Sequence, residues 1–478
     1  MKECLIGAEI FILKQFRHLN LKKCCQKSRK RIDIDAKSQK KARFLEKKRK
    51  KVAKLLLRNI KECNFAVDNV CLLHKFRKRK MNQVSDRLAA MSPSATLAMS
   101  QKSSELKAQG VDVINLSVGE PDFTTPTHIK EAAKKAIDDN FSFYSPVTGY
   151  ATLRNAICQK LKKENNLEFT PDQIVCSNGA KQSVCNVILS IISKGDEVIV
   201  PAPYWVSYIE MVKLAEGTNV IVEAGLDQNF KITAEQLEKA ITPKTKGLIL
   251  CSPSNPTGAV YSKSELEALA KVIEKHPNII VIADEIYEHI NYVGKHESIA
   301  QFESIRDRVV IINGVSKGYA MTGWRLGWIA APLWIAKACS KLQGQYTSGP
   351  SSIAQKAAEA AYLGEQACVE TMRQAFERRR DLVISLVKEI KGLKVSIPDG
   401  AFYVFPECNS FFGKKTPKGD VIANANDLAM YILMEGHVAC VSGDAFGDKN
   451  CIRMSYATSE ENIKEAFRRI KECLDAIK

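Results

Sequence analysis

The segment VSKGYAMTGWRLGW, residues 315–328, places two cations among small residues directly after an apolar run. Lys317 follows the run VVIING (309–314), which is rich in β-branched residues and typical of a buried strand. Arg325 lies eight residues further along the chain. Other motifs of the chain have to explain why a lysine stands at the end of a buried strand with a second cation close behind it.

This strand is one of several apolar runs that alternate with helical patterns after residue 81. A capping box of Ser262 and Glu265 opens one such helix, whose apolar residues then repeat on one face. Strand–helix alternation predicts an α/β fold with a mostly parallel central sheet covered by helices on both faces. The apolar runs are QIVCS (173–177), DEVIVPA (196–202), GLILCS (247–252), IIVIADE (279–285) and VVIING (309–314).

The C-terminal third has a different pattern. VSIPDGAFYVFP (395–406) and CIRMSYAT (451–458) are interpreted as strands flanked by helices, which predicts a smaller α+β domain. We expect residues 125–374 to form the large domain, and residues 81–124 and 375–478 to form the small domain with an N-terminal arm.

Residues 1–80 form a basic extension. They hold 26 Lys+Arg against 7 Asp+Glu, an excess of 19 positive charges, whereas the remaining 398 residues have a net charge of −1. One glycine and no proline occur in the extension, and a new start-like sequence begins at Met81. We interpret the extension as a disordered tail or a start-site artefact, ahead of nucleic-acid binding or organelle targeting.

The cysteines and the apolar runs narrow the class of protein. Ten of the fifteen cysteines lie after residue 80, and none of these ten forms a CxxC pair. This usage predicts reduced thiols in a cytoplasmic protein, with neither a disulfide framework nor a metal site. Apolar runs stay well short of the roughly 18 residues that a membrane helix needs, so no membrane association is expected.

Polar residues stand where several predicted strands end. Asp284 closes one strand, Asn255 lies in the turn after another, and Trp205 follows a third. The run from strand 173–177 through Gly179 into a helix suits a phosphate held by helix N-terminal amides. Because ligands bind at the carboxyl ends of parallel strands, these residues and Lys317 are candidates for one site.

Four motifs, SKGYAMTGWRLG, SPSNPTG, ADEIYEH and SVGEPDF, resemble the signature segments of class I aminotransferases that depend on pyridoxal 5′-phosphate (PLP). They are similar in particular to the bacterial aspartate/prephenate aminotransferase branch, over about residues 81–478. The resemblance implies the type I fold of PLP-dependent transferases, with PLP bound to Lys317 as a Schiff base. For the PLP phosphate it implies contacts from Arg325, Gly179, Ala180, Lys181 and Ser316, while Gly314 stands where many members have a phosphate-binding serine.

The resemblance also assigns the ring and the substrate. It places Asp284 at the pyridine nitrogen, Asn255 and Tyr287 at the ring hydroxyl, and Trp205 on the ring face. For the substrate it implies Arg453 at the α-carboxylate and Gly119 close against the backbone, with Trp205 and Asn255 alongside. Tyr144 resembles the tyrosine that reaches the phosphate of the neighbouring subunit, which implies a homodimer with shared active sites.

The implied reaction is ping-pong transfer of an amino group from L-aspartate to 2-oxoglutarate. Transamination of prephenate, aromatic amino acids or alanine stays open. Some relatives that act on prephenate have a basic residue where this chain has Ser92, and its absence here disfavours prephenate. A β-lyase or decarboxylase of the same fold shares most of these residues, and the Arg453 segment favours transamination. An aminotransferase-like DNA-binding regulator is disfavoured, because residues 1–80 lack the pattern of short helices joined by a turn.

Overall fold

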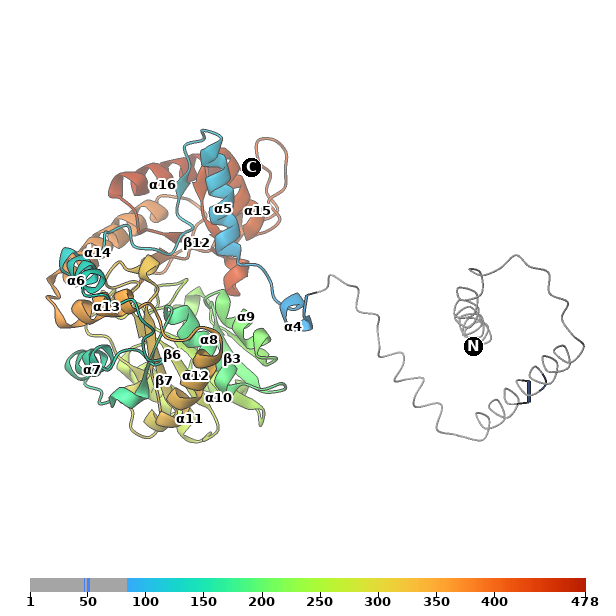
Figure 1. Ribbon diagram of the computed structural model, residues 1–478. Coiled ribbons are helices and arrows are strands. Elements are labelled where there is room, and N and C mark those ends of the chain that lie inside the picture. The colour runs from blue at the N-terminus through green and yellow to red at the C-terminus, as the bar shows by residue number, and fades with distance from the viewer. Residues whose placement is uncertain (1–46, 48–49, 52–83) are drawn as a thin grey trace, which may run out of the picture. The chain divides into compact units, whose positions relative to one another are not determined.

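The computed structural model describes residues 47, 50–51 and 84–478 (Figure 1). The expectations for the basic extension therefore fall almost entirely outside the described residues. Residues 84–478 form one compact unit by their contacts, so the division of this part into two domains stays a prediction. Among the described residues no helix is long and apolar enough to cross a membrane.

A seven-stranded sheet forms the centre of this unit, in the order β2-β8-β7-β6-β5-β3-β4. Neighbouring strands from β7 to β4 are parallel, and β8 runs antiparallel to both β7 and β2. The predicted mostly parallel α/β sheet is thereby confirmed. The strands are β2 (Ile174–Ser177), β3 (Glu197–Ala202), β4 (Thr218–Glu223), β5 (Thr245–Cys251), β6 (Ile280–Asp284), β7 (Val309–Gly314) and β8 (Gly327–Ala330).

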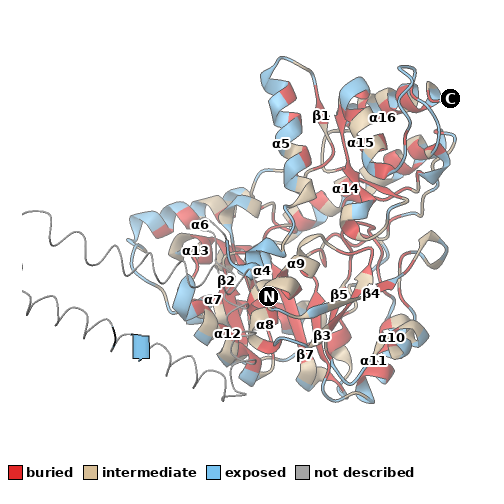
Figure 2. Ribbon diagram, turned by 90° about the vertical axis from the view of Figure 1, so that its right-hand side faces the viewer, coloured by how far each residue is buried: buried red, intermediate tan, exposed pale blue. Residues whose placement is uncertain are grey.

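Helices cover both faces of this sheet because its strands are apolar on both sides. In β7, Val309 and Ile311 face one hydrophobic cluster, and Val310 and Ile312 face another. Figure 2 shows the buried strands between their helices. These helices are α6 (Thr127–Asp138), α7 (Ala151–Lys160), α8 (Ala180–Ile191), α9 (Ser207–Leu214), α10 (Ala234–Ala240), α11 (Lys263–Glu274), α12 (Leu333–Tyr346) and α13 (Ser352–Leu363).

The start of α11 follows from its sequence. Ser262 accepts a hydrogen bond from the Glu265 backbone at 3.3 Å, and the Glu265 carboxylate accepts one from the Ser262 backbone at 2.7 Å. The predicted capping box is therefore present. The apolar face of α11 is buried against the sheet, through Leu266, Leu269, Ala270 and Ile273.

A second region, called the small lobe below, joins the beginning of the described chain to its end. β1 (Ile114–Asn115) pairs in parallel with β10 (Val438–Ala439). A three-stranded antiparallel sheet has the order β11 (Val441–Ser442), β12 (Ile452–Ser455), β9 (Tyr403–Val404). Its helices are α5 (Ala95–Ala108), α14 (Ala367–Lys388), α15 (Ala425–Gly436) and α16 (Glu460–Asp475), with the short α4 (Asp86–Ala89) before them.

One strand prediction in this lobe was too long. The segment 395–406 forms a strand only over Tyr403–Val404, because Pro398, Asp399 and Gly400 bend the chain into a turn before it. The segment 451–458 forms β12 as predicted.

Candidate active site

A cavity of about 440 Å³ opens where the parallel strands end. Cys251 and Asp284 are the last residues of β5 and β6, and Lys317 follows β7. Arg453 enters from β12 of the small lobe. Of the thirteen predicted site residues, eleven line the cavity: Gly119, Ala180, Lys181, Trp205, Asn255, Asp284, Tyr287, Ser316, Lys317, Arg325 and Arg453.

Lys317 lies in the turn after β7, partly buried at the cavity wall. Its ammonium donates a hydrogen bond to the carbonyl of Gly119 at 2.5 Å. Burial, together with the positive charges of Arg453 and Arg325, lowers the pKa of Lys317 to about 8. About a tenth of this amine is therefore neutral and nucleophilic at pH 7, far more than for an ordinary lysine.

Asp284 is buried at the end of β6, with 4% of its surface exposed. Its carboxylate accepts hydrogen bonds from the Tyr208 hydroxyl at 2.6 Å and from the Ile286 backbone at 3.3 Å. Burial outweighs both bonds and raises the pKa of Asp284 to about 6. Such a carboxylate favours a partner that brings a proton or a positive charge.

Arg453 is a buried arginine, 1% exposed, whose guanidinium faces the cavity. It donates to Asn255 Oδ1 at 3.0 Å and to the Ser117 carbonyl at 2.5 Å. Its Nε–H has no hydrogen-bond partner, and Tyr403 and Phe446 stack on it with centroids 4.7 and 4.8 Å from Cζ. A buried cation with unused donors is suited to bind a carboxylate.

Aromatic side chains form much of the remaining wall. The Tyr287 and Tyr403 hydroxyls share a hydrogen bond of 2.8 Å, and the Tyr287 ring lies 5.6 Å from the Lys317 ammonium. Trp205 packs edge to face on Tyr208, with ring centroids 5.3 Å apart. The Lys181 ammonium lies 4.9 Å from the centre of the Trp205 ring.

The other end of the cavity forms an anion cradle at the start of α8. Gly179 stands just before the helix with φ +84°, and a Cβ there would lie 2.8 Å from Cζ of Arg325. Arg325 itself has a left-handed backbone, φ +56°, and donates to the Asn178 carbonyl at 3.2 Å. Free helix amides and a guanidinium at one point suit a phosphate. Ser316 lines the same cavity and is buried.

The structure also explains why Gly314 is not a serine. Gly314 pairs with Gly327 across β7 and β8, and a Cβ at Gly314 would lie 2.7 Å from the Leu326 carbonyl oxygen and 2.8 Å from Gly327 Cα. A side chain there would force the two strands apart. The cradle is therefore built from the other residues, without a hydroxyl from this position.

Two predicted residues lie outside the cavity lining. Gly179 directly precedes the lining residue Ala180. Tyr144 is 97% exposed and does not line the cavity within this chain. Its contact with a second subunit stays a prediction.

Sequence reasoning missed several residues that the fold brings to this cavity. Tyr208 comes three positions after Trp205, a helical spacing that could have indicated a shared face. The hydroxyl of Thr322 donates to Glu120 at 2.6 Å, which joins the segment after Gly119 to the loop after Lys317. The polar and aromatic side chains among the additional lining residues include Ser94, Thr96, Glu120, Tyr208, Thr322 and Tyr403.

These residues fit PLP. The group needs an amine, a carboxylate for its ring nitrogen and an anion cradle for its phosphate, and Lys317, Asp284 and the start of α8 line one cavity. The pKa of Asp284, raised by burial, suits a carboxylate that gains a protonated partner. The cradle also depends on glycine, because a Cβ at Gly327 would lie 2.7 Å from Ala180 Cα.

Comparison with known proteins agrees with this geometry. The profile of the family "Aminotransferase class I and II" matches residues 111–470, so this chain belongs to that family of transaminases. The predicted family and fold are thereby confirmed.

Two similar curated proteins and two solved structures illustrate the relation. A probable aspartate/prephenate aminotransferase of Rickettsia bellii is 48% identical over 399 residues, 83% of this chain and 100% of the relative. The bifunctional aspartate and glutamate/aspartate-prephenate aminotransferase of Petunia hybrida is 48% identical over 83% of both chains. The aspartate aminotransferase of Rhizobium meliloti superposes with a TM-score of 0.81 at 41% identity, covering 83% of this chain and all of that one. That of Thermus thermophilus with maleate gives 0.77 at 41%, covering 82% and 100%.

Proposed function

We propose that this aminotransferase moves the amino group of L-aspartate to 2-oxoglutarate in two half-reactions, with PLP in the cavity. The observation that carries the proposal is Arg453, a buried guanidinium with unused donors in the cavity that also contains Lys317. It would bind the α-carboxylate that every amino-acid donor and oxo-acid acceptor has. Relatives and solved structures named as aspartate aminotransferases support the choice of donor.

Each of these residues would contribute to holding the cofactor. Arg325, Ser316 and the backbone of Gly179 and Ala180 would hold the phosphate, and Asp284 the ring nitrogen. The other contacts would be Asn255 and Tyr287 at the ring hydroxyl and Trp205 on the ring face. When bound, PLP supplies the electron-withdrawing ring that makes the hydrogen on the substrate Cα removable.

Lys317 would do the proton transfer. With cofactor and substrate bound, the neutral Lys317 amine would take the proton from the substrate Cα, hold it on Nζ and donate it again to complete the transfer. The lowered pKa of Lys317, about 8, suits an amine that must both accept and release a proton near neutral pH. The Gly119 carbonyl, which accepts from Lys317, and the backbone of Gly119 would limit how the substrate approaches.

A dicarboxylate needs a second cation for its side chain. Four cations line the cavity, and three of them, Lys317, Arg325 and Arg453, already have functions above. We assign the side-chain carboxylate to Lys181, in place of the phosphate contact that the resemblance implies. The support is that Lys181 lies over the Trp205 ring at the cavity wall and forms no ion pair with any part of the chain that the structure describes.

Prephenate is the second candidate acceptor, because several relatives 45–48% identical are named for both substrates. One contact favours aspartate. Some relatives that act on prephenate have a basic residue at the position of Ser92. Here that position holds a neutral serine, whose backbone N–H donates to the Glu210 carboxylate at 2.9 Å.

A donor panel tests the choice. Purified protein with PLP and 2-oxoglutarate should use L-aspartate with the largest kcat/KM among aspartate, alanine and aromatic amino acids. Amination of prephenate by glutamate or aspartate at a higher kcat/KM would overturn it. Lys317→Ala should abolish turnover with every donor, while Lys337→Ala, an exposed lysine on α12, should keep wild-type rates.

We also propose a homodimer in the cytoplasm. The exposed Tyr144 would reach the phosphate of the second subunit, and the ten free cysteines of the described chain are typical of a reducing compartment. Sedimentation should give twice the chain mass, and Tyr144→Ala should weaken PLP binding. Mixing Tyr144→Ala with Lys317→Ala chains should restore some activity, because one of the two shared sites then has both wild-type residues.

A further inference from the structure

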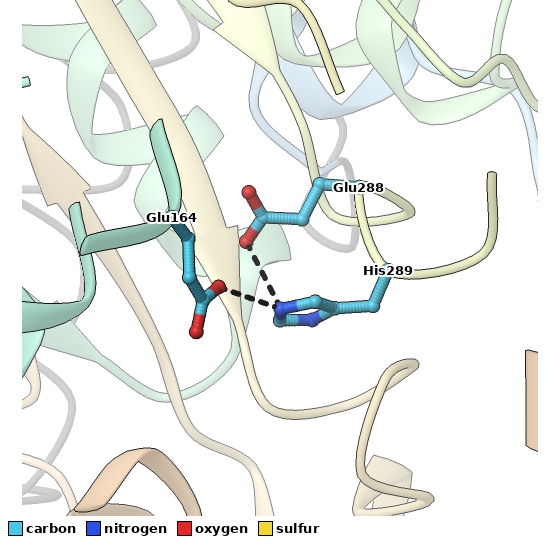
Figure 3. Close-up of side chains that lie close together, drawn as sticks. All are labelled: Glu164, Glu288 and His289. Atoms are coloured by element: carbon cyan, nitrogen blue, oxygen red, sulfur yellow. Dashed lines mark hydrogen bonds and ion pairs between the residues drawn. The ribbon is translucent and has the colours of Figure 1, made fainter. Parts of the chain in front are cut away.

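A buried ionic network lies where the end of α7 meets the turn after β6. Figure 3 shows its three acid and imidazole members, Glu164, Glu288 and His289. The His289 Nε2 lies 2.9 Å from Glu164 and 3.9 Å from Glu288. The fourth member is Lys160, whose ammonium forms an ion pair with Glu288 and lies 3.5 Å from Glu164.

The end of α7 brings two of these residues into place. The helix continues from Lys160 into a π-helical turn over Leu161–Asn165 that contains Glu164. Lys160 donates to Asn165 Oδ1 at 2.8 Å, and Asn165 donates to Glu288 at 3.0 Å. Lys160 and Glu288 have side chains only 1% and 4% exposed.

Lys160 makes this an ionic network instead of a metal site. Two carboxylates and a histidine could hold a divalent cation. The Lys160 ammonium already supplies the positive charge beside both carboxylates. Burial alone would raise the pKa of Glu288, but Lys160, His289 and His296 together outweigh it and hold that pKa well below its ordinary range, so Glu288 stays ionised.

Glu288 connects two active-site loops. It comes four residues after Asp284 and directly after Tyr287, and its Oε1 accepts a hydrogen bond from Asn313 at 2.8 Å. Asn313 lies on β7, four residues before Lys317. Backbone bonds already join this turn to β7, since Asp284 pairs with Ile312 and the Glu285 N–H donates to the Ile312 carbonyl at 2.9 Å. The Glu288–Asn313 bond adds a buried side-chain link between the turn that contains Asp284 and the end of the strand that leads to Lys317.

A second contact acts at the same junction. The His289 ring packs edge to face on Tyr319, with centroids 5.5 Å apart. It also covers Gly318, where a Cβ would lie 3.1 Å from Cβ of His289. Both neighbours directly follow Lys317, so the turn 284–289 contacts the lysine turn on both sides of Lys317.

We propose that Glu288, held by Lys160, is a positioning residue that fixes the Asp284 turn relative to Lys317. The chemistry needs Asp284 and Lys317 at opposite ends of one ring, so their separation must be constant to a fraction of an ångström. The inference rests on the proposed function for its activity assay. Arg453 binds substrate from the small lobe, outside this network, so the network acts on the chemical step and not on donor binding.

Glu288→Gln tests this in the PLP-loaded enzyme. We expect kcat per bound PLP to fall at least tenfold while KM for the amino donor stays within threefold. Glu285→Gln is the matched control, since the Glu285 side chain is buried in the same turn but contacts Ser298 and His296. Only its backbone bonds to β7, and the substitution keeps that bond. The control should keep kcat within threefold. A Glu288→Gln enzyme that also keeps kcat within threefold would refute the proposal.

A double-mutant cycle separates positioning from general destabilisation. Asn313→Ser removes the donor of the bond but keeps the Lys160–Glu288 ion pair, so it serves as the test if Glu288→Gln does not fold. Glu288→Gln keeps an acceptor and weakens the same bond by removing its charge. If both changes act through this bond, the double variant should lose little more kcat than Asn313→Ser alone. Multiplicative losses in kcat would contradict a shared bond.

A readout without PLP completes the experiment. In cofactor-free protein, the labelling rate of Lys317 by a small amine reagent should change with pH differently in Glu288→Gln and in wild type, and identically in Glu285→Gln and wild type. An unchanged Lys317 profile in Glu288→Gln would oppose the proposal. If wild type prefers a donor other than aspartate, the proposed donor is wrong, and the same variants are assayed with the preferred donor.

Discussion

Replacing Arg453 with methionine should remove recognition of the α-carboxylate while leaving the protein folded. A guanidinium has five N–H donors, and Arg453 uses two of them for Asn255 and Ser117. Two of the remaining donors can form a two-pronged bond with a carboxylate. Hydrogen bonds to charged groups contribute about 1.5–3 kcal/mol each, so the pair contributes about 3–6 kcal/mol. The expected loss in kcat/KM is about 10²-fold to 10⁴-fold.

The assay compares donors as well as variants. Arg453→Met should lose this factor with L-aspartate but not with a simple primary amine that lacks the α-carboxylate. Stability should change little, because the substitution removes a buried cation instead of leaving a charge unpaired. Thermal unfolding of both proteins checks this.

Arg380→Met provides the matched control. Arg380 is also a mostly buried arginine stacked on a tyrosine, with Cζ 4.7 Å from the Tyr292 ring, but it pairs with Asp381 outside the cavity. It should keep wild-type kcat/KM. A loss below tenfold in Arg453→Met, or an equal loss with the primary amine, would refute the assignment of Arg453.

Three further predictions follow from the same site. Burial raises the pKa of Asp284 from 3.8 to about 6, so its stability contribution is present below pH 3.8 and is lost as the pH rises through 6. In denaturant unfolding of cofactor-free protein, Asp284→Asn should therefore raise the free energy of unfolding by about 3 kcal/mol at pH 8 and by little at pH 3.5. The same substitution should abolish activity. In cofactor-free protein, labelling of Lys317 should have a midpoint near pH 8, and a midpoint near 10.5 would contradict the lowered pKa. Gly327→Ala places a methyl 2.7 Å from Ala180 Cα and should lower the free energy of unfolding by about 1–3 kcal/mol. Gly344→Ala is the control, because its methyl would lie 3.7 Å from Val147 and should not destabilise the protein.

Local patterns predicted much of this fold. The helix start at Ser262 depends on residues three apart, and the parallel strands appear as short apolar runs, so both can be identified in the sequence. The antiparallel direction of β8 could not, because an apolar run such as WIAA has no direction of its own. Strand pairing is decided by long-range packing.

The site residues likewise fall into those that the sequence could predict and those that it could not. Asp284 and Lys317 follow strands, and the edge of a parallel sheet brings such residues together. The Tyr208–Asp284 bond joins residues 76 positions apart, and Glu288, in the turn after β6, accepts a bond from Asn313 on β7. Neither pair has a sequence signal, because each depends on how two elements pack. The function of Gly314 is likewise visible only once β7 and β8 are paired.

The cavity mouth offers a practical route to altered enzymes. Ser94, Thr96 and Leu97 line it from the beginning of α5, and none of them belongs to the central sheet. Leu97 is 68% exposed, so larger or charged side chains fit there without repacking a core. A library restricted to these three codons would sample donor preference while leaving the catalytic loops and their stability unchanged, which makes this short segment a natural first target for redesign.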